Sequence, residues 1–256
     1  MSKTILNQTV DFKYHEPAAE TNFVEFKKVV ESRRSVRVFL SEPPSDEIIN
    51  ECLRLALLAP NSSNLQTTDF YVVQNTVLKE KLSVACMNQS AARTAPLLIV
   101  CVARPYQWKS SADQMLKVFD EMGENREIVR SYYSKLVHFY YGTGPFGLLT
   151  LLKKLIVPIV GLFKVVPRGP YGHSGLMIWA NKSAALACEN LMLAFRAAGF
   201  DTCPMEGFDE KRIKNLFSLG CKDSICMVIS VGKRADHGVY GPQIRFPMSQ
   251  FVRYYR

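Results

Sequence analysis

The stretch from Ser32 to Phe39 (SRRSVRVF) places three guanidinium groups within five residues, just before an apolar position. An arginine side chain offers a rigid fork of N–H donors that matches two phosphate oxygens at once. The hydroxyl of Ser35 adds a further donor between the arginines. Short basic clusters are also common on solvated surfaces, so this stretch alone leaves a phosphate site and a surface patch both open.

Composition narrows the class of protein. A chain of 256 residues, 48% hydrophobic and 21% charged, can bury one large core or two small ones. Its formal net charge of +9 suits an anionic partner, which can be a nucleic acid, a membrane surface or a small molecule. The sequence shows no zinc-ligand spacing, RNP-like aromatic motif or heptad-linked basic region, so nucleic acid is not favoured.

Cysteine usage indicates a reducing compartment. The chain has seven cysteines, an odd number, without a C-x-x-C pair, and several lie inside apolar runs. The four histidines are scattered without ligand spacing, so we expect no metal site. Residues 1–8 lack the long apolar core of a secretory signal, and we therefore expect a cytoplasmic location.

Apolar periodicity and capping residues predict helices that alternate with strands. We expect helices over residues 23–32, from the N-cap Ser45 to Pro60, over about 112–140 with breaks, over 181–198 and over 209–217, and strands over 70–73, 97–102 and 225–231. The unbroken apolar run 225–231 is typical of a strand covered on both faces. We expect one α/β or α+β domain over residues 1–256.

Three further segments complete a recognisable pattern. They are 59–66 (APNSSNLQ), 203–208 (CPMEGF), and 231–234 (VGKR) leading to 241–245 (GPQIR). Together with 33–39, and in this order, they resemble the nitroreductase family of FMN-dependent, NAD(P)H-oxidising flavoproteins; the resemblance covers about residues 23–104 and 176–252. It implies an α+β fold with a central, mainly antiparallel sheet flanked by helices, and an intertwined homodimer with FMN at the subunit interface.

The resemblance implies roles for the arginine segment. Arg33 and Arg245 would hold the FMN phosphate, and Ser35 would add a hydroxyl donor. Arg34 would contact the ring or the ribityl chain. Arg37 would lie near the pyrimidine edge, where a positive charge stabilises the reduced anion.

The second segment would reach the flavin from the other subunit. Its small and amide side chains would hydrogen-bond the ring and ribityl chain; they are Pro60, Asn61, Ser62, Asn64 and Gln66. On the residues alone, a simple helix stop is the favoured interpretation of this segment.

The third segment would lie against the ring. Pro204, Met205, Glu206 and Gly207 would contact it, with backbone N–H groups aimed at N5 and O4 and with no Cβ at Gly207 to block the approach. Asn88 would reach the pyrimidine carbonyl edge. The reactive group would be flavin N5, tuned by Arg37 and the Glu206–Gly207 amides, so we nominate no catalytic side chain.

The chain departs from the family pattern at two places. Thr67 and Thr68 stand where the family often has proline and an aromatic residue, and Gln243 stands where a lysine is common. Lys233 or Arg234 would then replace the missing cation at the phosphate.

Residues 142–147 (GTGPFG) match the G-x-G-x-x-G pattern, but we reject a dinucleotide-binding turn there. The acidic residue expected about 20 positions later is absent, and Pro145 would disturb the turn into a helix.

The stretch from residue 128 to 188 contains no Asp or Glu, and we interpret about 105–175 as a basic and apolar helical insertion. On a helical wheel of 146–164, Lys153 and Lys154 fall opposite a broad apolar side. A membrane-spanning helix is disfavoured, because each of these lysines would cost about 2.5–3.5 kcal/mol near the bilayer centre. The alternatives are a helical pair that packs on the dimer or covers the flavin, and an amphipathic helix on an anionic membrane.

The predicted activity is ping-pong transfer of a hydride from NAD(P)H through FMN to an electron-poor acceptor, such as a nitroaromatic or a quinone. Reductive dehalogenation or flavin fragmentation on the same fold is one alternative. A non-catalytic flavin-binding or membrane-surface protein is another.

Overall fold

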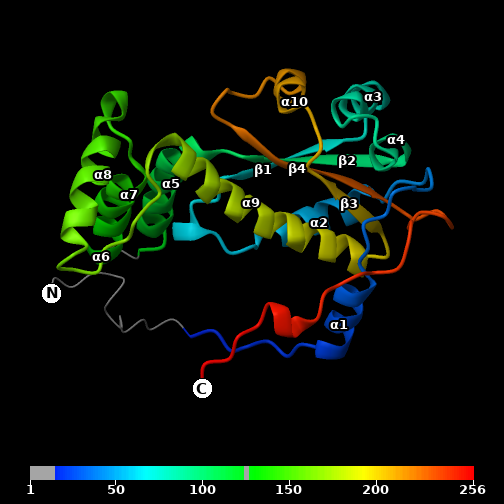
Figure 1. The fold of residues 1–256 in the computed structure, drawn as a ribbon, viewed down its shortest axis with the longest axis horizontal. Coiled ribbons are helices and arrows are strands. Elements are labelled where there is room, and N and C mark those ends of the chain that lie inside the picture. The colour runs from blue at the N-terminus through cyan, green and yellow to red at the C-terminus, as the bar shows by residue number, and fades with distance from the viewer. Residues whose placement is uncertain (1–14, 124–126) are drawn as a thin grey trace.

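The fold is built on an antiparallel sheet (Figure 1) in this computed structural model, which describes residues 15–123 and 127–256. Within these residues, four strands follow the order β1-β2-β4-β3. They are β1 (Thr68–Val73), β2 (Leu97–Ala103), β3 (Asp201–Met205) and β4 (Ser224–Gly232), and every neighbouring pair is antiparallel. The arrangement confirms the predicted α+β fold with an antiparallel sheet.

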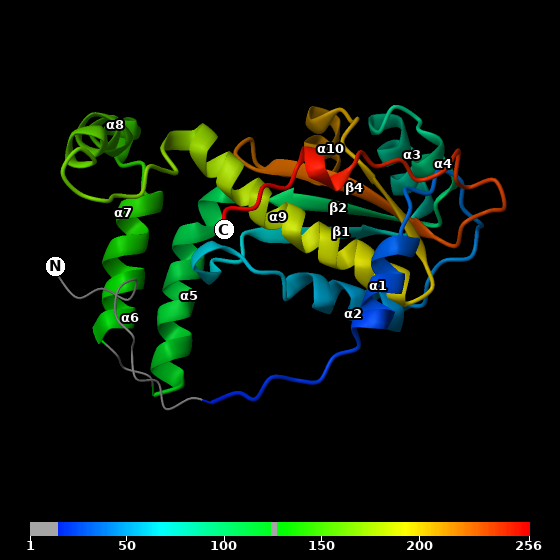
Figure 2. The ribbon, with the colours of Figure 1, turned by 60° about the horizontal axis from the view of Figure 1, so that its bottom comes forward.

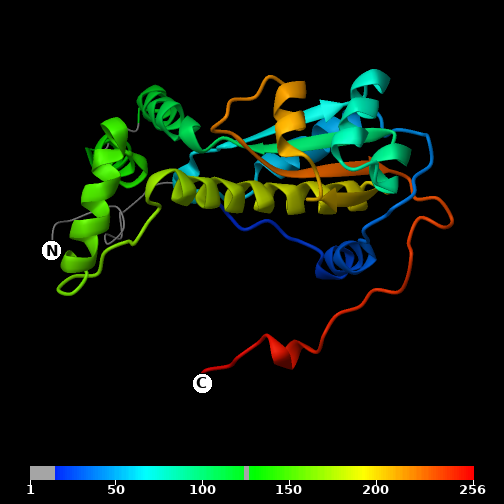
Figure 3. The same ribbon diagram turned by 45° about the horizontal axis from the view of Figure 1, so that its top comes forward.

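Alternate residues of β2 face two helical layers, as the period of a strand requires. Leu97, Ile99 and Cys101 share a core with α9 (Gly172–Ala197) and α2 (Asp46–Leu57). Leu98 and Val100 face the other layer. That layer consists of α3 (Thr76–Ala85), α4 (Ser90–Thr94) and α10 (Glu210–Leu216) (Figure 3). The whole of β2 is buried, which explains its unbroken apolar sequence.

Side-chain caps begin the predicted helices. Ser45 Oγ accepts a hydrogen bond from the backbone N–H of Ile48 at 3.4 Å, and Asp209 Oδ1 accepts one from Arg212 at 3.1 Å. The helix α1 (Phe23–Ser32) has the predicted bounds. By contrast, α9 begins at Gly172, nine residues before the predicted start at 181, because Leu176, Trp179 and Ala180 pack into the same core and outweigh the low helix propensity of two glycines.

The segment from residue 105 to 171 gathers at one end of the molecule (Figures 1 and 2). Its helical elements are η2 (Pro105–Gln107), α5 (Trp108–Glu121), α6 (Glu127–Ser131), the π-helical turn η3 (Tyr132–Leu136), α7 (Val137–Tyr141), η4 (Pro145–Gly147) and α8 (Leu148–Val160). Among the described residues, no single helix is long and apolar enough to cross a membrane. One pair, Glu127–Tyr141 and Pro145–Val160, passes on length and composition but is bent by 61°.

The glycine-rich segment 142–147 joins α7 to α8 and follows no strand. A Cβ on Gly142 would lie 2.4 Å from the carbonyl oxygen of His138. Gly144 has φ +70°, and a Cβ there would lie 2.7 Å from Cβ of Leu149. These glycines therefore allow the backbone to turn sharply between the two helices, where a side chain would clash.

The two ends of the described chain leave apolar side chains uncovered. No residue of α1 is buried, and after Gly241 the chain runs away from the body of the protein to the C-terminus (Figure 3). The exposed side chains include Phe23, Val24, Phe26, Tyr240, Ile244, Phe246, Phe251 and Tyr254. Such a concentration of exposed aromatic residues is typical of an interface.

Asp201, only 3% exposed, joins β3 to the chain after β4. It accepts hydrogen bonds from Arg234 Nη2 at 2.6 Å and from Arg196 Nη1 at 2.8 Å. We expect Asp201→Asn to lower the free energy of unfolding by about 2–3 kcal/mol, because hydrogen bonds to charged groups contribute about 1.5–3 kcal/mol. Urea denaturation measures the change.

Asp209→Asn is the matched control, because asparagine caps a helix about as well as aspartate. Equal unfolding midpoints for the two variants would contradict the structural role given to Asp201.

Candidate active site

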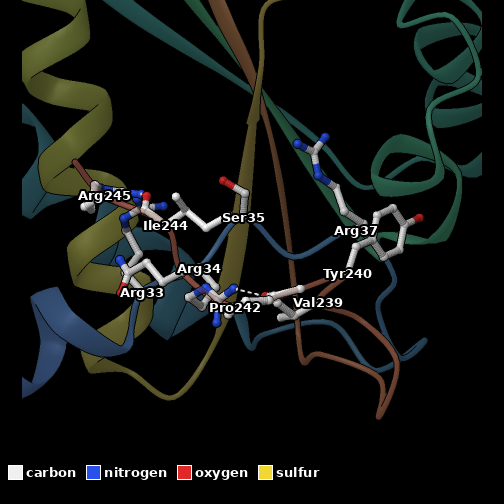
Figure 4. A pocket seen from close by; sticks show the side chains of 11 residues that line it. Arg33, Arg34, Ser35, Arg37, Val239, Tyr240, Pro242, Ile244 and Arg245 are labelled. Carbon is white, nitrogen blue, oxygen red and sulfur yellow. Dashed lines mark hydrogen bonds between the residues drawn. The ribbon is translucent and has the colours of Figure 1, made fainter.

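The arginine segment and the chain after β4 together form a cavity of about 290 Å³ (Figure 4). The backbone fixes the segment from both sides: the N–H of Val36 donates to Thr202 O at 3.1 Å, and that of Arg37 to Gly238 O at 2.7 Å. The lining residues are Arg33, Arg34, Ser35, Arg37, Val239, Tyr240, Gly241, Pro242, Gln243, Ile244 and Arg245. The first and fourth sequence segments thus meet in space.

Guanidinium groups dominate one side of this cavity. Arg33, Arg34 and Arg245 gather there, whereas Arg37 lies beyond Ser35, beside the ring of Tyr240 (Figure 4). Arg34 donates to the carbonyl oxygen of Gly241. Nη1 of Arg33 is buried and has no hydrogen-bond partner among the described residues. A buried donor without a partner is costly, so this atom is suited to an anionic ligand.

No carboxylate from the described part of the chain lines the cavity. The two cations predicted as replacements at the phosphate are engaged elsewhere: Arg234 binds Asp201, and Lys233 Nζ lies 3.1 Å from a carboxylate oxygen of Glu42. Neither is among the lining residues, so the positive charge comes from the arginines.

The chain passes from buried to exposed residues at the end of β3. Cys203 and Met205 are buried, Pro204 is half-buried, and Glu206 and Gly207 are exposed. Burial raises the pKa of the Cys203 thiol, although the nearby charges of Arg37 and Arg33 oppose the shift, so it stays protonated at neutral pH.

Asn88 and its neighbour have different surroundings. The side-chain amide of Gln89 donates to the carbonyl oxygen of Gly207 at 2.8 Å. Asn88 is exposed and lines a separate cavity beside α3 and α4, so within the described chain it is Gln89 that reaches the Glu206–Gly207 turn. No motif pointed to Gln89, because its role depends on how α4 packs beside β3.

The loop from Pro60 to Gln66 is shaped by its own side chains. Asn61 Oδ1 accepts a hydrogen bond from the N–H of Gln66 at 2.8 Å. Ser62 Oγ lies 3.0 Å from the hydroxyl of Tyr141, and Ser63 Oγ lies 2.7 Å from that of Tyr132. The loop therefore packs on the segment 105–171, through tyrosines that the sequence pattern did not single out.

Within one chain, the loop from Pro60 to Gln66 and the arginine cavity do not meet. The loop lies beside α5, at the opposite end of the sheet from α1 and the arginine segment (Figures 1 and 2).

Three thiols also meet in the core, which the cysteine spacing did not indicate. Cys101, Cys188 and Cys226 come from β2, α9 and β4, and their sulfur atoms lie within 4.8 Å of one another. A register shift pairs Cys101 with Met227 and Val102 with Ile225, leaving Cys226 as the extra residue of a bulge.

This chain belongs to the nitroreductase family, whose sequence model matches residues 30–233. The chain is 29% identical over 233 residues to MhqN of Bacillus subtilis (strain 168), a protein provisionally named an NAD(P)H nitroreductase; the match covers 90% of this chain and 98% of MhqN. It is 25% identical over 228 residues to the 4-nitrobenzoate reductase of Pseudomonas putida, covering 87% and 91% of the two chains.

Solved structures share the fold. The protein ydfN of Bacillus subtilis, provisionally named a nitroreductase, is 26% identical, with a TM-score of 0.73 over 91% of this chain and 100% of its own. A protein of Exiguobacterium sibiricum, provisionally named a nitroreductase and solved in complex with FMN, is 24% identical, with a TM-score of 0.62 over 93% and 99% of the chains.

Proposed function

We propose that this protein is an FMN-dependent oxidoreductase that transfers two electrons from NAD(P)H to an electron-poor organic acceptor. The observation that supports this proposal most strongly is the arginine cavity, where the buried Nη1 of Arg33 has no hydrogen-bond partner within the described chain. Bound FMN would supply a ring that accepts a hydride from NAD(P)H and passes two electrons on. For a quinone, NAD(P)H and one proton give NAD(P)⁺ and the hydroquinone.

The residues present fit the cofactor. Arg33 and Arg245 would hold the phosphate, helped by the exposed hydroxyl of Ser35, and Arg34 on the same side of the cavity would contact the ring or the ribityl chain. Arg37, beyond Ser35 in the same cavity, would place a positive charge at the pyrimidine edge. Positive charge there favours the electron-rich, reduced ring, because the interaction is strong where water is excluded.

We propose that a homodimer completes the site. The loop from Pro60 to Gln66 and the arginine cavity of the same chain lie at opposite ends of the sheet (Figures 1 and 2). The exposed apolar residues of α1 and of the C-terminal segment are suited to bury against a second copy. In such a dimer, the loop of one protomer would meet the arginines of its partner.

Arg33→Ala tests the phosphate assignment. We expect the Kd for FMN to rise by at least about 10-fold, because the lost contacts are charge-assisted hydrogen bonds. The Kd for riboflavin, which lacks the phosphate, would stay unchanged. Flavin fluorescence titration measures both constants.

Arg54→Ala is the matched control for charge, because Arg54 lies on the surface of α2, paired with Glu51 at 2.7 Å. If Arg33→Ala lowers the affinity for riboflavin and for FMN equally, Arg33 does not bind the phosphate.

A second proposal concerns α8. In the structure, Lys153 and Lys154 do not share one solvated basic face of this helix. Lys153 is buried, and its Nζ donates to the carbonyl oxygens of Gly142 at 2.6 Å and Tyr140 at 3.2 Å. Burial lowers the pKa of Lys153. With this lysine turned inward, apolar side chains of α8 and the following turn are exposed; they include Leu148, Leu151, Leu152, Leu155, Ile156, Ile159, Leu162 and Phe163.

We propose that this face of α8 rests on an anionic membrane surface. Lys164 is exposed in the same segment, which lacks acids from residue 128 to 188, so no carboxylate there would repel an anionic surface. Basic side chains beside an exposed apolar helix face complement an anionic bilayer. The protein would then lie in the cytoplasm and bind the membrane surface. Its seven cysteines are all free thiols, which is typical of a reducing compartment.

The triple variant Leu151→Gln/Leu155→Gln/Ile159→Gln tests this contact by co-sedimentation with phosphatidylserine vesicles. We expect the bound fraction to fall by more than about 10-fold, because each apolar side chain buried contributes about 1.5–3 kcal/mol. The control is Val77→Gln/Val84→Gln, which removes exposed apolar side chains of α3. Equal pelleting of all three proteins would exclude the membrane contact. If the triple variant instead dissociates into monomers, α8 packs on the second copy.

A further inference from the structure

A second cavity, of about 750 Å³, lies between the loop after α2 and the segment 105–171. Ser62 and Ser63 form one wall, and residues of η3, α7, α8 and α9 form the others. The lining residues are Ser62, Ser63, Tyr132, Tyr140, Tyr141, Lys154, Pro167, Arg168, Gly169, Pro170, Tyr171, Gly175, Ile178, Trp179 and Lys182. The volume lies within the usual range of small-molecule sites.

Positive charge and hydrogen-bond donors converge on this cavity. Lys154, Arg168 and Lys182 line it, and the described residues contribute no carboxylate to its walls. Among the described residues, none of these three cations has an ion-pair partner, and Arg168 makes one long hydrogen bond, from Nη2 to the carbonyl oxygen of Gly161 at 3.5 Å. The cations are therefore available to a ligand, and an anionic ligand would balance their charge.

Trp179 supplies an independent observation. Its side chain is buried and lines the cavity, and its indole Nε1–H has no hydrogen-bond partner among residues 15–123 and 127–256. Buried indole N–H groups normally have an acceptor. A ligand oxygen in the cavity would supply one. The rings of Tyr132 and Tyr140 add aromatic walls beside it.

We propose that this cavity binds the electron acceptor and selects aromatic acceptors that carry an anionic group, such as a carboxylate. The inference rests on the proposed function, because Ser62 and Ser63 belong to the loop assigned there to the flavin of the partner. Lys154 and Arg168 hold the anionic group, and the Trp179 N–H donates to a ligand oxygen. The tyrosine rings pack against the aromatic ring of the acceptor.

The test compares 4-nitrobenzoate with its uncharged methyl ester as acceptors, using the FMN-loaded protein. We expect Lys154→Gln/Arg168→Gln to lower kcat/KM for 4-nitrobenzoate by about 10-fold or more and to leave the ester within about twofold. The control is Lys109→Gln/Lys135→Gln, which removes equal charge from exposed lysines outside the cavity wall. It should affect both acceptors equally and slightly.

Binding without turnover gives a second readout. Benzoate, which is not reduced, should quench tryptophan fluorescence in the wild type, and Trp179→Phe should abolish most of the quenching. If the wild type reduces both acceptors with the same kcat/KM and the cavity variants change them in parallel, the anionic selectivity is wrong.

Failure of the proposed function has a different signature. If the wild type reduces neither of the two acceptors nor menadione, the protein is not the proposed oxidoreductase. The proposal that the cavity binds an electron acceptor is then also wrong. Benzoate binding that survives in Lys154→Gln/Arg168→Gln contradicts the anion site itself.

Discussion

One buried sheet holds the two halves of the proposed cofactor site apart. The strands β2 and β4 are almost wholly buried and packed by helices on both faces, so the sheet is a rigid spacer. The arginine segment is fixed at one end through its hydrogen bonds to Thr202 and Gly238, and the loop after α2 is fixed at the other through tyrosines. In the proposed homodimer, the loop of one protomer would meet the arginine segment of the other, and the two parts of the site would come together.

The arginine cavity also carries an energetic constraint. Several guanidinium groups share a small space that no carboxylate of the described chain enters, so their mutual repulsion opposes folding until an anion binds. The nearby Asp201 does not relieve it, because Arg196 and Arg234 already occupy that carboxylate. Binding of a phosphate would then stabilise the fold as well as position the ligand.

Local signals in the sequence predicted much of this fold. Ser45 and Asp209 are caps whose side chains act within one turn, so they could be read without tertiary information. The apolar run of β4 predicted a strand covered on both faces, and the structure confirms it. The shared cavity of Arg33 and Arg245 followed from resemblance, since two segments over 200 residues apart carry no local signal for each other.

Other features depend on packing between distant elements. Lys153 looks like part of a solvated face, yet backbone carbonyl groups left free at the end of α7 draw it inward. Gln89 meets Gly207 only because α4 packs beside β3, and the contacts of Ser62 and Ser63 exist only because η3 and α7 fold back on the loop. Neither periodicity nor spacing reports such contacts.

Complementation between two defective chains tests the shared site most directly. One chain carries Arg33→Ala/Arg245→Ala, and the other carries Asn64→Gly/Gln66→Gly, which removes the amides while suiting the positive φ angles at both positions. Each variant alone should bind FMN poorly. Random pairing on co-expression should restore about a quarter of the wild-type FMN sites, because half of the dimers are mixed and each holds one intact site. Co-expressed chains that bind no more FMN than the separate variants would contradict a site built across the interface.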